Sequence, residues 1–193
     1  MIGVLPNQEI EKLIKIGAIS SDVPIESEQI QPASLDMRLG SKAFRIRASF
    51  LPGNREKVEE RLKSLQMHEI DLRGGAVLEK GCVYLVPLLE VLKLPTDIQA
   101  AANAKSSTGR LDLLTRTISD SGEEFDRISS GYSGKLYAEI CPRSFSVLVR
   151  TGMKLNQIRF RNKNTTLNDE RLKALHAKEK LVPGNAIIDD GLG

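Results

Sequence analysis

The sequence predicts a mainly β domain, a sandwich or a distorted barrel with a few short helices, and three observations lead to this fold class. Residues from Ser34 to Leu39 alternate between apolar and polar, which is typical of a half-buried strand. Three further strand-like runs, at 136–140, 145–149 and 155–160, are separated by short turns. The chain has 193 residues, no Trp and 4% aromatic residues, so we expect Leu, Ile and Val to form one core.

Helices are expected at three places. Asn7 is a good N-cap residue for a first helix at 8–16, which Gly17 would end. A second helix is expected at 55–66 and a short charged helix at 168–179, because each has apolar residues three or four positions apart. These short helices would cover the edges and faces of the β structure.

The remaining elements set the predicted domain boundaries. The apolar run 83–89 contains Pro87, which favours an edge strand or a bulge. We expect residues 1–160 to form the β domain, and 161–193 to form a polar linker, a short helix and the start of a possible further segment. The ending, 185–193, is typical of the opening of a new strand, which leaves open that the sequence is part of a longer polypeptide.

Composition argues against several classes of protein. A formal net charge of +3 is too small to indicate nucleic acid or membrane binding by itself. The N-terminus does not have the pattern of a signal peptide, and no apolar run approaches the roughly 18 residues of a membrane span, so we expect a cytoplasmic location. Cys82 and Cys141 share no ligand spacing, and the histidines are His68 and His176, so no zinc site is expected.

Three short segments carry residues suited to chemistry. In 105–110, two cations flank hydroxyls and a glycine, which suits phosphate binding but also a polar helix start with a serine as its cap. In 126–134, two glycines bracket Tyr132, which is typical of a sharp hairpin turn. Glu139 lies in a predicted strand on the same face as Tyr137, and is either an exposed cross-strand partner or a functional acid.

The order of these segments resembles the dCTP deaminase family of the dCTP deaminase/dUTPase superfamily. Residues 31–40, QPASLDMRLG, are similar to the family pattern Q/N-P-A-S-x-D-x-R-L-G, and 105–110, KSSTGR, to R-S-S-x-x-R. Residues 127–134 resemble R-I-D-P-G-(aromatic)-x-G, with Glu139 five residues past the final glycine, as in the family. Residues 151–160 resemble the closing P-G-M…Q-(apolar)-x-F strand.

The resemblance spans about residues 7–160 and is strongest to the N-terminal half of a tandem-domain variant of the enzyme. It implies a dUTPase-like fold and the hydrolytic deamination of dCTP to dUTP and ammonia, without zinc, in pyrimidine deoxynucleotide metabolism. Mg²⁺ would enter bound to the triphosphate of the nucleotide. The family builds its sites between the subunits of a homotrimer or trimer-like assembly, with no nucleic acid or membrane partner, and regulation by dTTP stays open.

The resemblance also implies roles for individual residues. Glu139 would be the general base, Ser106 would position the attacking water, and Arg110 with Lys105 would supply charge to the triphosphate. Backbone groups of the strand 136–140 would read the base. The implied nucleotide-binding residues are Lys105, Ser106, Ser107, Thr108, Gly109, Arg110, Ser129, Tyr137, Ala138 and Glu139, and none is assigned to a metal.

The sequence departs from the family pattern at several points. Lys105 replaces an arginine, and Ser129 with Ser130 replaces Asp-Pro. The resemblance implies that this aspartate binds the sugar 3′-hydroxyl, and that the equivalent acid activates water in related dUTPases. Ser129 can still form a hydrogen bond with the sugar, but it cannot act as a base. Residues 119–124 resemble an insertion, and the family's C-terminal tail is not recognisable after Phe160. Two alternatives therefore stay open: a non-catalytic nucleotide-binding or structural half of a tandem deaminase, or a dUTP diphosphatase, against which the loss of the aspartate argues.

Overall fold

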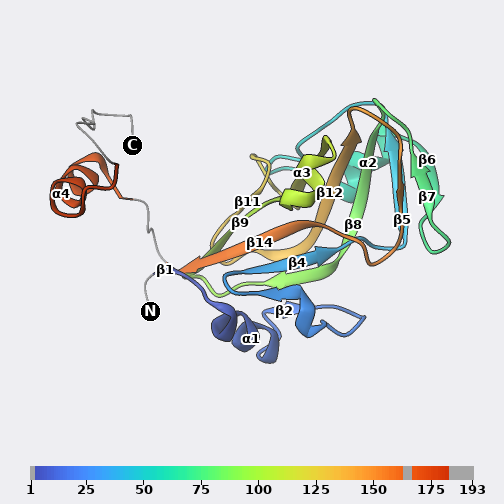
Figure 1. Cartoon of the computed structure of the whole chain (residues 1–193). Helices are drawn as coiled ribbons and strands as arrows, with labels where there is room; N and C mark the ends of the chain where they lie inside the picture. The colour runs from blue at the N-terminus through green and yellow to red at the C-terminus, as the bar shows by residue number, and fades with distance from the viewer. Residues whose placement is uncertain (1–2, 163–166, 183–193) are drawn as a thin grey trace. The chain divides into compact units, whose positions relative to one another are not determined.

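The computed structural model describes residues 3–162 and 167–182 (Figure 1). Its contacts divide the chain into two units, Met1–Lys163 and Asn164–Gly193. In the second unit, the helix α4 (Asp169–Glu179) forms where the sequence predicts it, and the Asn168 side chain accepts a hydrogen bond from the backbone N–H of Arg171. The predicted strand opening at 185–193 lies outside the described residues.

Two six-stranded antiparallel sheets make up most of the first unit. The first sheet has the order β11-β9-β14-β4-β3, with β1 paired to β14, and the second has the order β10-β12-β8-β5-β6, with β2 paired to β8. A two-stranded sheet joins β7 and β13. The predicted mainly β class is confirmed, in its sandwich form. The strands are β1 (Gly3–Val4), β2 (Ile19–Ser20), β3 (Ile30–Gln31), β4 (Ser34–Arg38), β5 (Lys42–Ile46), β6 (Gln66–Asp71), β7 (Ala76–Leu78), β8 (Val83–Lys93), β9 (Ile98–Ala104), β10 (Leu113–Ser119), β11 (Arg127–Ile128), β12 (Ser133–Pro142), β13 (Val147–Val149) and β14 (Lys154–Asn162). The helices of this unit are α1 (Asn7–Lys15), α2 (Val58–Leu65) and α3 (Ser106–Arg110), with a 3-10 turn at Ser27–Gln29.

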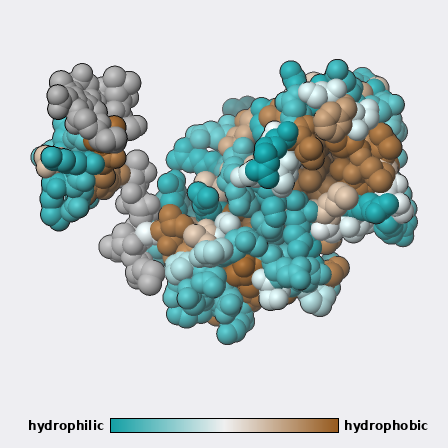
Figure 2. All heavy atoms as spheres, in the orientation of Figure 1, coloured by the Kyte–Doolittle hydropathy of each residue, from teal (hydrophilic) through white to brown (hydrophobic). Residues whose placement is uncertain are grey.

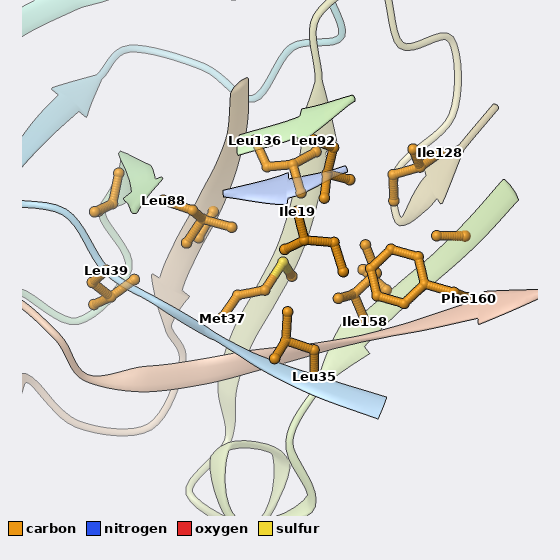
Figure 3. Close-up of a cluster of buried hydrophobic side chains, with 14 of the residues drawn as sticks. Ile19, Leu35, Met37, Leu39, Leu88, Leu92, Ile128, Leu136, Ile158 and Phe160 are labelled. Atoms are coloured by element: carbon orange, nitrogen blue, oxygen red, sulfur yellow. The ribbon is translucent and has the colours of Figure 1, made fainter. Parts of the chain in front are cut away.

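The main core lies between the two sheets (Figure 3). Leu35 and Met37 of β4 and Phe160 of β14 come from the first sheet, and Leu136 of β12 comes from the second. All four side chains are almost completely buried. Full burial of one such side chain stabilises the fold by about 1.5–3 kcal/mol, so this cluster holds the two sheets together.

A second apolar cluster covers the outer face of the second sheet. The helix expected at 55–66 is α2, whose Val58 and Leu62 pack against Ile118 of β10 and Tyr137 of β12. The second sheet is therefore buried on both faces where Ile118 and Tyr137 lie. Along β12, Leu136, Ala138 and Ile140 belong to the core between the sheets, and Tyr137 belongs to the cluster under α2.

The first helix begins with Asn7, which the sequence predicts as its N-cap. The N-cap residue is Pro6, which has extended dihedral angles and offers no side-chain capping bond. The backbone N–H of Asn7 instead donates to the carbonyl oxygen of Pro32 at 3.0 Å, so a tertiary contact replaces the local cap. Ile10 and Leu13 are buried, as the apolar spacing predicts.

Strand β4 is buried along its whole length, so the prediction of a half-buried strand is wrong. Asp36 is 2% exposed and Arg38 is 3% exposed. Arg38 Nε donates to Glu90 Oε1 at 2.8 Å, and the guanidinium also donates to two backbone carbonyls of the preceding loop. Burial of the polar side is possible because each charge meets a partner from another segment, which alternation alone cannot reveal.

Strand β8 is a central strand, so the edge-strand alternative for 83–89 is wrong. It pairs with β12 on one side and with β5 and β2 on the other. Pro87 lies where the register with β12 shifts, between Lys135 and Tyr137, and this irregular pairing accommodates a residue without an N–H. The Pro87 carbonyl accepts a hydrogen bond from the backbone N–H of Gly40 at 2.8 Å.

This close approach predicts that Gly40→Ala destabilises the domain. A Cβ at residue 40 would lie 2.6 Å from the Pro87 carbonyl oxygen, a backbone atom that cannot turn aside. We expect the free energy of unfolding in urea to fall by about 1–3 kcal/mol, the usual cost of overpacking. The matched control is Gly74→Ala, where a Cβ would meet nothing within 4 Å. Equal stabilities of the two variants would contradict this reading of the contact.

Candidate active site

The segment 105–110 forms the short helix α3 at the end of β9. The expected polar helix start is confirmed, but its N-cap residue is Lys105, which makes no side-chain capping bond, and not a serine. The backbone N–H of Lys105 and the hydroxyl of Thr108 both donate to the carbonyl oxygen of Leu155, at 2.9 and 3.0 Å. The segment is therefore fastened to the beginning of β14, and Thr108 is buried there.

A cavity of about 300 Å³ lies beside this helix. Lys105, Ser106, Ser107 and Arg110 line it from α3 and its N-cap, and Gln31, Asp36 and Gln157 line it from β3, β4 and β14. Three of the four sequence motifs, the ones at 31–40, 105–110 and 151–160, thus meet in one place.

The cations of this cavity differ in their partners. The Lys105 ammonium is ion-paired with the carboxylate of Asp36, whose other oxygen, Oδ1, is buried with no hydrogen-bond partner among the described residues. Arg110 is exposed, and no carboxylate in the described part of the chain pairs with it. Arg110 is therefore the freer of the two predicted phosphate-binding cations.

Glu139 lies on β12 directly opposite Arg116 of β10. Its side chain is 2% exposed, and its Oε1 accepts hydrogen bonds from Arg116 Nη2 at 2.5 Å and from Nε at 3.1 Å. Oε2 is buried and has no hydrogen-bond partner among the described residues. The alternative of an exposed cross-strand partner is wrong, because the carboxylate is buried while its partner is only partly covered.

Asp126, for which the sequence predicts no role, lies close enough to this ion pair for the charges of Arg116 and Glu139 to act on it. The backbone N–H of Thr117 donates to its Oδ1 at 2.7 Å, and the residue has a positive φ of 61°. Burial raises the pKa of Asp126, hydrogen bonds from Thr117 and the charge of Arg116 oppose the rise, and the charge of Glu139 adds to it. No local pattern in the sequence distinguishes this aspartate, since its neighbours come from other strands.

The hairpin before β12 is held by Tyr132. Its hydroxyl donates to the carbonyl oxygen of Lys135 at 2.5 Å and accepts a hydrogen bond from the backbone N–H of Asp120 at 2.9 Å. Burial raises the pKa of Tyr132, so the hydroxyl keeps its proton. A Cβ at Gly134 would lie 2.7 Å from that hydroxyl, and Gly131 has a φ of +70°. Any other residue would be strained at either position, which explains both glycines of the motif.

A second cavity of about 390 Å³ lies between this hairpin and the loop 119–124. Arg127, Ser129 and Tyr132 line its hairpin side. Ser129, expected to contact the sugar, therefore faces this cavity and not the one beside α3. Arg127 pairs with Glu124 of the loop at 2.9 Å.

The side chains of Tyr137 and Ala138 point into the two apolar clusters. Tyr137 packs under α2, where burial raises the pKa of its hydroxyl, and Ala138 is completely buried between the sheets. Strand β12 pairs with β10 and β8, and the pairing with β8 is interrupted between Lys135 and Tyr137. The backbone of β12 is thus engaged by both neighbouring strands except at this interruption.

Within one chain, Glu139 is not among the residues that line the cavity beside α3. The structure thus brings the predicted phosphate-binding residues together and leaves the predicted general base outside their cavity. In the described part of the chain, no three His, Cys, Asp or Glu side chains gather as a metal site, and Cys82 and Cys141 are free thiols. No helix among the described residues has the length and apolar character to cross a bilayer.

Comparisons with known proteins bear on this geometry. Residues 1–164 match a family model described as "2'-deoxycytidine 5'-triphosphate deaminase (DCD) N-terminal domain". The solved structure of 2'-deoxycytidine 5'-triphosphate deaminase from Agrobacterium tumefaciens is 50% identical with a TM-score of 0.87, and the match covers 97% of this chain and 56% of that one. The chain therefore spans little more than half of that protein.

Curated relatives are similar over most of their own length. A dCTP deaminase from Haemophilus influenzae is 32% identical over 70% of this chain and 70% of its own. A dUMP-forming dCTP deaminase from Beutenbergia cavernae is 28% identical over 81% of this chain and 78% of its own.

The hydrogen bonds of Tyr132 predict a measurable cost for Tyr132→Phe. The substitution keeps the ring and removes both bonds, so we expect a loss of about 1–3 kcal/mol in the free energy of unfolding. Tyr84→Phe is the comparison, because the Tyr84 hydroxyl accepts one bond from the backbone N–H of Glu79 and should cost about half as much. Wild-type stability in Tyr132→Phe would show that the hydroxyl does not fasten the hairpin.

Proposed function

The chain belongs to the 2'-deoxycytidine 5'-triphosphate deaminase N-terminal domain family, and from this premise we propose that it carries out the hydrolytic deamination of dCTP to dUTP and ammonia. The observation that carries the proposal is the buried carboxylate of Glu139, whose Oε2 has no hydrogen-bond partner among the described residues. An unengaged carboxylate oxygen in a water-poor setting is suited to take a proton from a bound water.

In this mechanism, Glu139 removes a proton from water as the water oxygen adds to C4 of cytosine. Ser106 holds the water in place, and the tetrahedral intermediate collapses when Glu139 returns the proton to the departing amine. One water is consumed and one ammonia is released for each dUTP formed. We propose that the carboxylate and not a zinc ion activates the water, which the lack of a zinc-ligand pattern in the sequence supports.

The cavity beside α3 is proposed to hold the triphosphate with its Mg²⁺. Arg110 offers a guanidinium with no carboxylate partner in the described residues, and Ser106 and Ser107 offer hydroxyl donors. Lys105 contributes less, because an incoming phosphate must compete with Asp36 for its ammonium. Ser129 would meet the sugar hydroxyl as a hydrogen-bonding partner.

We propose that a neighbouring copy completes each site in a homotrimer or trimer-like assembly. The support is that Glu139 does not line the cavity that Ser106 and Arg110 line within one chain. Apolar residues also gather on the face in Figure 2, over the end of the domain where Figure 1 places β5, β6 and β7. Val77 of β7 and its cross-strand partner Leu148 of β13 are exposed, and exposed apolar residues that gather on one face are typical of an association surface.

A second candidate function is favoured by the internal pairing of charges. Glu139 is paired with Arg116 and Lys105 with Asp36, so two of the predicted site groups already have charged partners within the chain. A non-catalytic half that binds nucleotide or completes an assembly would have this property. Calorimetry with dCTP separates the two candidates, since binding without turnover supports the non-catalytic one.

The deaminase proposal predicts that the chain, incubated with dCTP and Mg²⁺, releases ammonia and dUTP. Glu139→Gln should lower this turnover by about 100-fold or more, because the amide cannot accept the proton. Its unfolding midpoint should change little, since the amide oxygen can still accept from Arg116. Glu79→Gln, at an exposed ion pair with Arg45, is the control and should keep full turnover.

Chromatography of the products sharpens this test. If the products are dUMP and pyrophosphate in place of dUTP, the chain has the dUMP-forming activity for which several relatives are named. Full turnover in Glu139→Gln would contradict the assigned mechanism.

Shared sites predict that two inactive variants restore each other. We expect Ser106→Ala and Glu139→Gln each to be inactive, and their co-assembled mixture to regain about one quarter of wild-type turnover, because intact halves meet by chance in that share of sites. The measurement is ammonia release after joint refolding of equal amounts. A mixture no more active than its separate components would show that both residues act within one chain.

A further inference from the structure

Arg116 and Glu139 are cross-strand neighbours on the outer face of the second sheet. Residues in direct register on antiparallel strands have side chains within about 5.5 Å, so the two meet without any loop having to close. Arg116 gives two N–H groups, Nε and Nη2, to the same oxygen, Oε1 of Glu139. The two oxygens of the carboxylate are therefore not equivalent: one is doubly bonded, and the other is unengaged among the described residues.

The guanidinium of Arg116 is itself held from two further directions. Its Nη2 donates to Ser49 Oγ at 3.0 Å, and its Cζ lies 3.7 Å from the centroid of the Phe125 ring. Ser49 precedes α2, and Phe125 follows β10, so segments far apart in the sequence converge on one side chain. Although Arg116 is 31% exposed, its position is set by hydrogen bonds in its plane and by a ring against its face.

Arg116 also balances the charge of this region. Glu139 is buried, and a buried carboxylate without a cation is strongly destabilised. Asp126 brings a second carboxylate near the first, and the charges of Arg116 and Glu139 act on it in opposite directions. Removing Arg116 would leave both carboxylates without this compensation.

We propose that Arg116 is a positioning residue for the deamination reaction. Arg116 holds Oε1 of Glu139, so that Oε2 is the oxygen that faces the attacking water. The inference rests on the proposed function and adds to it a residue that does not touch the substrate. A lysine could reach the carboxylate, but it cannot donate two N–H groups in one plane, bond Ser49 and stack on Phe125 together. Lysine should therefore replace arginine only in part.

The test compares Arg116→Gln and Arg116→Lys with wild type in the 193-residue chain. Steady-state kinetics with dCTP and Mg²⁺ should give a kcat lowered by about 10- to 100-fold in Arg116→Gln, the range for losing a precisely held geometry, while KM changes less than about threefold. Arg116→Lys should recover part of the lost kcat. The control is Arg73→Gln, which removes an exposed guanidinium from Asp71 and should leave kcat unchanged.

A second variant keeps the charge in place. Ser49→Ala removes one of the contacts that orient Arg116, so it should lower kcat a few-fold with KM unchanged. If Arg116→Gln fails to fold, the kcat of Ser49→Ala tests the role of Arg116 in its place. The inference is overturned by a wild-type kcat in Arg116→Gln or, where that variant does not fold, in Ser49→Ala. A loss confined to KM, or an Arg116→Lys no more active than Arg116→Gln, also overturns it.

The same experiment separates this inference from the function on which it rests. If the wild-type chain turns over dCTP and Arg116→Gln has the same kcat, only the role of Arg116 is overturned. Wild-type chain that releases no ammonia from dCTP overturns the proposed function and this inference with it.

Discussion

The pairing of β12 with a strand on each side is the constraint on which the candidate site depends. The register with β10 runs without a break from Leu113 opposite Pro142 to Ser119 opposite Leu136. It sets Glu139 against Arg116 and sends Tyr137 under α2. A slip of one residue would turn the carboxylate into the core between the sheets, so the register and the chemistry cannot be separated.

The buried charged side chains named above form ion pairs with residues of distant segments. Arg38 meets Glu90, Lys105 meets Asp36, and Arg116 meets Glu139. In each pair at least one partner is buried, so losing the other would leave an uncompensated charge. The pairs explain why motif residues can be polar and yet lie inside the domain. Arg38 fastens a loop to the sheet, and Asp36 ties the N-cap of α3 to β4.

The sequence predicted the parts of this structure that depend on local pattern. Alternation along 136–140 predicted which face carries Glu139, and apolar spacing predicted that Ile10 and Leu13 are buried. Predictions were wrong where a distant partner decides the outcome. Pro87 lies in a central strand because the register shifts beside it, and β4 is buried because its charges have partners.

The candidate site shows the same division. Resemblance to a family pointed to Glu139 and to the segment 105–110. Periodicity predicts the face of the strand on which a side chain lies, but it does not predict which side chain of another strand will contact it. Arg116 and Asp126 were therefore missed, although register and burial place both beside Glu139. The sequence also could not show that three motifs meet in one cavity while Glu139 stays outside it.

A crystal structure of Glu139→Gln with dCTP and Mg²⁺ would show whether two copies share each site. We expect a triphosphate against Ser106 and Arg110 of one copy, and the cytosine C4 beside residue 139 of another. A nucleotide whose base lies far from residue 139 of every copy, or whose phosphates lie away from α3, would contradict it.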